Sequence, residues 1–138
     1  MTTTARGSFD VQLTPQPLAH GDDALLGRRS IDKRFHGDLE ATSGGEMLSA
    51  GTAVPGSAGY VAIERVSGTL HGRAGAFVLQ HSGTMTRGAG QLSVTVVPDS
   101  GAGELAGIAG TMTITIVDGA HTYEFAYTLG AESSADDG

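Results

Sequence analysis

Apolar and polar residues alternate in short runs along most of the chain. The runs are rich in Val, Ile, Thr, Phe and Tyr, and Gly, Pro, Asp or Ser residues separate them. A period of two residues with this composition is typical of β-strands, and no long run shows the period of a helix. Only residues 103–109 have a pattern that fits a helical turn. The predicted strands span residues 7–13, 28–39, 46–50, 59–70, 76–85, 91–97, 111–117 and 121–129.

Glycine marks most of the breaks between these runs. The chain holds 22 glycines in 138 residues, about twice the average frequency. The pair Asp118-Gly119 lies between two alternating runs and is a strong β-hairpin signal. Turns are also predicted at Ser43–Gly45, at Pro55-Gly56 and at residues 71–75. Many short strands punctuated by glycine are typical of a sandwich or a barrel.

The strand count favours a barrel. Short links between successive strands indicate antiparallel pairing, and an open sheet of about eight strands would leave two exposed edges. Closure removes both edges, so we predict an all-β fold, a small closed antiparallel β-barrel of about eight strands. The length fits one domain, which we place at residues 6–130, with flexible tails at residues 1–5 and 131–138.

Composition and charge exclude several classes of function. The chain has no cysteine, which excludes disulfides, thiolate metal sites and thiol nucleophiles. Its formal net charge is −7 and its Lys and Arg residues do not cluster. Binding to nucleic acid or to an anionic membrane is therefore not expected. We find no signal peptide and no apolar run of membrane-spanning length, so we expect a cytoplasmic protein.

Motifs for metals and cofactors are absent from the sequence. The five histidines are never closer than ten residues, so no short metal-binding motif is present. The glycine-rich run at residues 100–104 lacks the Lys-Ser/Thr pair of a phosphate-binding loop, and we interpret it as a turn. We therefore expect no metal and no cofactor.

A few polar residues share the apolar parity of their strands. Lys33 lies between Ile31 and Phe35, Glu64 between Ala62 and Val66, and His81 follows Leu79 at the same parity. In a closed barrel these side chains point inward, where an unpaired carboxylate is unfavourable and its pKa is pushed upward. Glu64 and His81 are the candidate catalytic pair. The candidate ligand-binding residues are Tyr60, Lys33, Arg65, Phe77, Tyr123 and Tyr127.

An alternative interpretation assigns these groups a structural role. Glu64 would then form an ion pair with Lys33 or Arg65, and a backbone carbonyl would satisfy His81. Because adjacent strand residues point to opposite faces, Arg65 lies inward only if the assigned parity of that strand is wrong. Small residues at the predicted inward positions Gly37, Ala62 and Gly83 would leave room for a ligand.

Several longer segments resemble the bacterial DUF3224 family. They are KRFHGDL at residues 33–39, GEML at 45–48, GYVAIERVSGTLHGRAGAFVLQHSGTM at 59–85, VVPDSGAGELAGIAG at 96–110 and HTYEFAYTL at 121–129. The resemblance implies a barrel similar to allene oxide cyclase but no particular activity. The chain departs from the family pattern at Thr14, where the family often has Trp, and at Asp99 and Ala102, where it usually has Gly and Thr.

These observations predict a barrel that binds a small apolar or amphipathic molecule in its interior. An eight-stranded barrel is wide enough for side-chain filling or one small ligand. If the protein is an enzyme, cofactor-free isomerisation or cyclisation needs only a shaped apolar site and proton-handling groups. The alternatives are a non-catalytic ligand carrier and an interaction protein with a solid core. Threonines at 111, 113 and 115 on an outer face favour a homo-oligomer.

Overall fold

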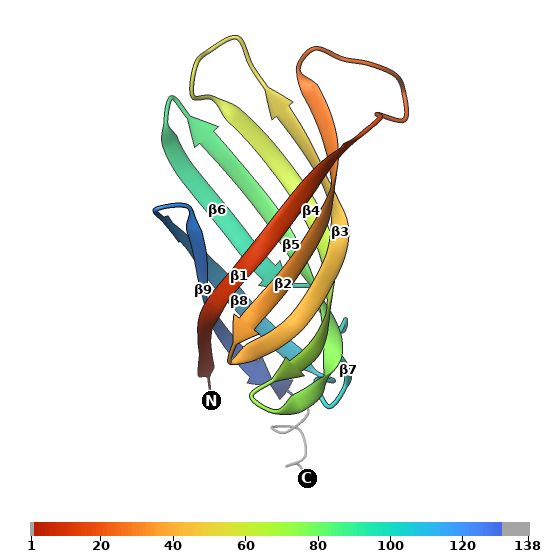
Figure 1. Cartoon of the computed structure of the whole chain (residues 1–138), viewed down its shortest axis with the longest axis vertical. Coiled ribbons are helices and arrows are strands. Elements are labelled where there is room, and N and C mark those ends of the chain that lie inside the picture. Colours follow the sequence, from red (N-terminus) through yellow and green to blue (C-terminus); the bar gives the residue numbers. More distant parts are fainter. Residues whose placement is uncertain (1, 131–138) are drawn as a thin grey trace.

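The computed structural model describes residues 2–130 as one sheet of nine strands. None of these residues belongs to a helix that is long and apolar enough to cross a membrane. The strand at one end of the sheet order also pairs with a strand near the other end, from Ala58↔Met85 to Leu70↔Arg73, so the sheet closes (Figure 1). The strands are β1 (Thr3–Gln16), β2 (Leu26–Gly37), β3 (Leu39–Gly51), β4 (Ala58–Leu70), β5 (Arg73–Thr86), β6 (Ala89–Val96), β7 (Ala102–Gly103), β8 (Ile108–Val117) and β9 (Ala120–Leu129).

Eight of these strands form a closed antiparallel barrel, which confirms the predicted fold class. Around the barrel the order is β1-β2-β3-β4-β5-β6-β8-β9, and every pairing is antiparallel. The short β7 pairs only with the start of β5. The narrower expectation of an allene oxide cyclase-like barrel stays a prediction.

The boundaries of the predicted domain need one correction. β1 begins at Thr3 and pairs with β9 from Thr3↔Tyr127 onward, so residues 3–5 belong to the barrel and not to a flexible tail. The predicted tail at residues 131–138 lies outside the described residues.

The predicted turn at Ser43–Gly45 was wrong. β3 runs without a break from Leu39 to Gly51, and the chain instead turns at Gly37 and Asp38. Gly45 allows β3 and β4 to approach each other closely, because a Cβ at this position would lie 2.0 Å from the carbonyl oxygen of Ile63. A glycine inside a strand often marks such a close approach of another backbone.

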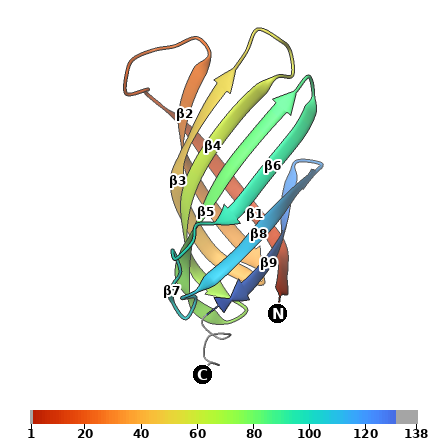
Figure 2. The same cartoon turned by 180° about the vertical axis from the view of Figure 1, so that it is seen from behind.

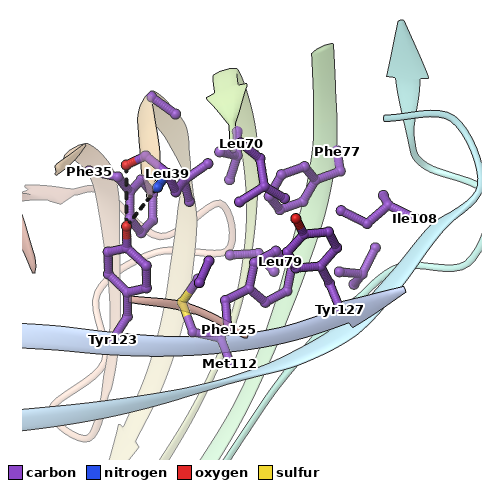
Figure 3. Close-up of a cluster of buried hydrophobic side chains, with 14 of the residues drawn as sticks. Phe35, Leu39, Leu70, Phe77, Leu79, Ile108, Met112, Tyr123, Phe125 and Tyr127 are labelled. Atoms are coloured by element: carbon purple, nitrogen blue, oxygen red, sulfur yellow. Dashed lines mark hydrogen bonds between the residues drawn. The ribbon is translucent and has the colours of Figure 1, made fainter. Parts of the chain in front are cut away.

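One half of the barrel interior is packed solid, and we call the end of the barrel on that side the packed end. Phenylalanine, leucine and tyrosine side chains from opposite walls meet there (Figure 3). Phe77 stacks against Phe125 with ring centroids 5.5 Å apart. The segment 97–107 covers this end and inserts Leu105, which is buried in the core. Members of this cluster that Figure 3 labels are Phe35, Leu39, Leu70, Phe77, Leu79, Ile108, Met112, Tyr123, Phe125 and Tyr127.

The other half is open, and we call it the open end. β6 and β8 share a single paired position, Thr95↔Thr111, and diverge beyond it (Figures 1 and 2). β1 leaves β9 after Phe9↔His121 and continues for another seven residues to Gln16. The β8–β9 hairpin therefore stops short of the open end. Inward-facing side chains on both sides of the divergence, such as Leu92 and Ile116, are exposed there.

Candidate functional site

A buried group of polar side chains lies between the packed and open halves. Glu64 on β4 is 0% exposed and accepts hydrogen bonds from three strands. Lys33 Nζ donates to its Oε2 at 2.8 Å, His81 Nε2 lies 2.5 Å from the same oxygen, and Ser43 Oγ donates to Oε1 at 2.5 Å. We call Lys33, Ser43, Glu64 and His81 the polar network. The structure thus places the two candidate catalytic residues in direct contact.

The sequence left two outcomes open for Glu64, an ion pair with Lys33 or Arg65 or a raised pKa, and the structure shows the ion pair with Lys33. Burial alone raises the pKa of this carboxyl, but the hydrogen bond from His81, the charge and hydrogen bond of Lys33 and the hydroxyl of Ser43 outweigh burial and lower it to about 2. The carboxylate is therefore ionised at neutral pH. It is a poor base, and its role is to orient the groups that donate to it.

Lys33 is held from two sides. Its ammonium group bonds Glu64, and it lies 4.6 Å from the ring centroid of Phe9 and 5.6 Å from that of Phe35. Aromatic faces attract a cation at such distances, more strongly when water is excluded. Lys33 therefore balances the charge of Glu64 in the interior.

Tyr60 connects the polar network to the open end. Its hydroxyl lies 3.2 Å from His81 Nδ1. Because Glu64 is ionised, His81 must carry a hydrogen on Nε2 to bond it, and its other ring nitrogen, Nδ1, faces the Tyr60 hydroxyl. Burial and the charge of Glu64 raise the pKa of Tyr60, which keeps its hydroxyl protonated. Together these bonds form the chain Tyr60–His81–Glu64–Lys33.

A cavity of about 710 Å³ opens on the other side of the Tyr60 ring. It lies at the open end, where β3, β4, β5 and β6 face the tip of β8. Its apolar lining comes mainly from large side chains that point into the barrel, and no charged residue borders it. The lining includes Met47, Tyr60, Met85, Leu92 and Ile116.

Gly83 holds the Tyr60 ring in place and does not leave empty space. The two residues are partners across β4 and β5, and a Cβ on Gly83 would lie 2.6 Å from Tyr60 Cε1. The ring therefore occupies the room that glycine provides. Gly37 was also expected inside the barrel, but it is exposed at the β2–β3 turn with φ +107°.

Of the six predicted ligand-binding residues, Tyr60 alone borders this cavity, while Lys33 lies in the polar network and four others lie elsewhere. Arg65 is exposed on the outer face of β4, as its adjacency to Glu64 requires. Phe77, Tyr123 and Tyr127 belong to the packed half. The Tyr123 hydroxyl bonds the backbone of His36 and Leu39, and that of Tyr127 bonds His71 Nδ1 at 2.6 Å. None of these four borders the cavity at the open end, and their role as ligand contacts stays a prediction.

Sequence reasoning missed Ser43 and most of the cavity lining. Ser43 was assigned to a turn, so its inward parity on β3 went unused. Met85, Leu92 and Ile116 have inward parity in the predicted strands, and that parity was the available signal. Strand parity alone does not show that these positions lie in the open half of the barrel.

A second hollow lies on the outer face of the barrel. It measures about 790 Å³ and is bordered by residues of β2, β3, β4 and β5, which include His81, and by the loop after β1. Leu48 is a representative lining residue, at 51% exposure. Across residues 2–130, no cluster of three or more His, Asp or Glu side chains is arranged to hold a metal ion.

Comparison with known proteins identifies relatives without an assigned activity. The profile of the family described as "Protein of unknown function (DUF3224)" matches residues 5–127. A crystal structure of a protein with unknown function from the DUF3224 family of Shewanella oneidensis MR-1 is 57% identical. It superimposes with a TM-score of 0.88, over 94% of this chain and 98% of that one. No curated protein matches the sequence.

Proposed function

Since the chain belongs to the DUF3224 family, whose description assigns no activity, we propose a function from the geometry of the site. The barrel binds one small amphipathic molecule in the cavity at its open end. The apolar part of the molecule lies against Met47, Met85, Leu92 and Ile116, and its polar group meets the hydroxyl of Tyr60.

The position of Tyr60 supports this proposal most directly. Its ring borders an apolar cavity, and its hydroxyl bonds a buried network of two charged groups and a histidine. A binding site for a small molecule typically combines a mainly apolar lining with a few placed polar groups. Exposed inward-facing apolar side chains at the rim also favour an occupant, because covering them is stabilising.

Two matched leucine variants test where a ligand binds. Leu92 borders the cavity at 48% exposure, and Leu48 borders the outer hollow at 51% exposure. The fluorescence of anilinonaphthalene sulfonate, titrated with each variant, reports apolar binding. Leu92→Gln should weaken the dye about tenfold, and Leu48→Gln should leave its affinity unchanged. The reverse ranking would place binding on the outer face and contradict the proposal.

A second candidate function is cofactor-free isomerisation or cyclisation. The observation that favours it is the contact between Tyr60 and His81, since a residue that borders the cavity can pass a proton between a substrate and an imidazole behind it. Glu64 would be a positioning residue in this reaction, because it touches His81 and does not border the cavity. Tyr60→Phe separates the two functions: a carrier should bind about tenfold more weakly because one hydrogen bond is lost, whereas an enzyme should lose turnover altogether.

The expected homo-oligomer and cytoplasmic location stay predictions. Light scattering coupled to gel filtration measures the first, and fractionation of the producing cells measures the second. A monomer in solution would leave the threonine-rich outer face of β8 without the predicted partner.

A further inference from the structure

The buried charges nearest to the open cavity are balanced within the protein. The charged groups of Lys33 and Glu64 lie 2.8 Å apart, and neither residue borders the cavity. His81 and Ser43 also bond this carboxylate. Within residues 2–130, no buried side-chain nitrogen or oxygen lacks a hydrogen-bond partner. No buried group in this part of the chain therefore needs a ligand to satisfy it.

The polar residues that do border the cavity are neutral. They are Ser49, Tyr60 and Thr84, which carry hydroxyl groups, and Gln91, which carries an amide. Burial and the charge of Glu64 raise the pKa of Tyr60, so its hydroxyl keeps its hydrogen at neutral pH. Such groups form hydrogen bonds with a ligand but have no charge that would neutralise an ion.

Arg29, a cation at the open end, does not border the cavity either. It is the partner of Met47 across β2 and β3, but it borders a separate hollow beside the loop after β1. None of the residues that line the cavity is charged. An ion that leaves water for such an apolar site loses its hydration and gains no counter-charge, whereas a neutral hydroxyl loses much less.

On the basis of the proposed binding function, we propose that the cavity selects an uncharged amphipathic alcohol over an acid or an amine of the same chain length. Its apolar chain lies against Met85 and Leu92, and its hydroxyl bonds the hydroxyl of Tyr60. An alcohol both donates and accepts, so it can bond Tyr60 whichever partner of the contact between Tyr60 and His81 carries the hydrogen. The selectivity comes from the missing counter-charge, so a charge added to the lining should change it.

Isothermal titration calorimetry with octan-1-ol, octanoate and octylamine tests the inference. At pH 7 the acid is ionised and the amine is protonated, so the three molecules share a chain length and differ in charge. Octan-1-ol should bind at least about tenfold more tightly than either ion. An ion that binds as tightly as the alcohol would overturn the inference and leave the proposed function standing. If none of the three binds, the proposed function itself is wrong.

Two matched lysine variants show whether the missing counter-charge causes the selectivity. Leu92→Lys adds a cation to the cavity lining, and its aliphatic stem keeps part of the apolar contact. The ratio of the affinity for octanoate to that for octylamine should rise about tenfold, because one ion is attracted and the other repelled. Leu48→Lys adds the same charge at the outer hollow and should leave this ratio unchanged. An equal ratio in the two variants would show that the lining of the cavity does not set the selectivity and would overturn the inference.

Discussion

The ring of Tyr60 lies directly over the α-carbon of Gly83, its partner across β4 and β5. A Cβ at Gly83 would come within 2.6 Å of the ring, closer than non-bonded carbon atoms approach one another. Gly83 therefore determines where the Tyr60 hydroxyl points, and through it the 3.2 Å contact with His81.

The substitution Gly83→Ala should displace the Tyr60 ring and break the contact between the Tyr60 hydroxyl and His81. The barrel should still fold, because the added methyl group meets a side chain at the open end and not the backbone. Histidine ¹⁵N chemical shifts should change for His81 and stay constant for His71 at the packed end. Unchanged His81 shifts would mean that Tyr60 does not need the glycine.

Removing one member of the Lys33–Glu64 pair should destabilise the barrel by about 3–5 kcal/mol, because the other is left buried without its counter-charge. The single variants are Lys33→Met and Glu64→Gln. The double variant should be more stable than the sum of the single effects predicts. Urea unfolding of all four proteins measures the coupling, and additive effects would show that the two charges act independently.

Strand parity explains why part of this site was predictable. A strand has a period of two, so Lys33, Glu64 and His81 could be placed inside without knowledge of their neighbours. The same rule placed Arg65 outside, although its charge had suggested a role at the site. Closure of the barrel followed from the number of strands and the short links between them.

Other features depend on contacts between distant strands and were not predictable locally. The pKa of Glu64 is low because β2, β3 and β5 each bring it a donor, and that convergence follows from the register of the sheet. The division into packed and open halves depends on where the β8–β9 hairpin ends relative to its neighbours. Gly45 carries the local signal of a turn but lies within a strand.

Phe77→Ala should separate stability from ligand binding. Phe77 is fully buried in the packed half and stacks on Phe125, so truncation should destabilise the protein by about 3–5 kcal/mol. The folded fraction should bind anilinonaphthalene sulfonate at the open end with unchanged affinity, because Phe77 does not border that cavity. If folded Phe77→Ala protein bound the dye more weakly than the wild-type protein does, the two halves of the barrel would be energetically coupled.

Acid should remove a defined part of the stability through Glu64. Its pKa is lowered on folding from 4.5 to about 2, so its stabilising contribution is complete above about pH 4.5 and declines as the pH falls toward 2. The shift corresponds to about 3 kcal/mol. Urea unfolding at several pH values between 7 and 2 measures the loss, and the Lys33→Met, Glu64→Gln double variant removes this contribution while keeping the other carboxylates. The wild-type protein should lose about 3 kcal/mol more than the double variant over this interval, and equal losses would show that Glu64 titrates alike in the folded and unfolded chains.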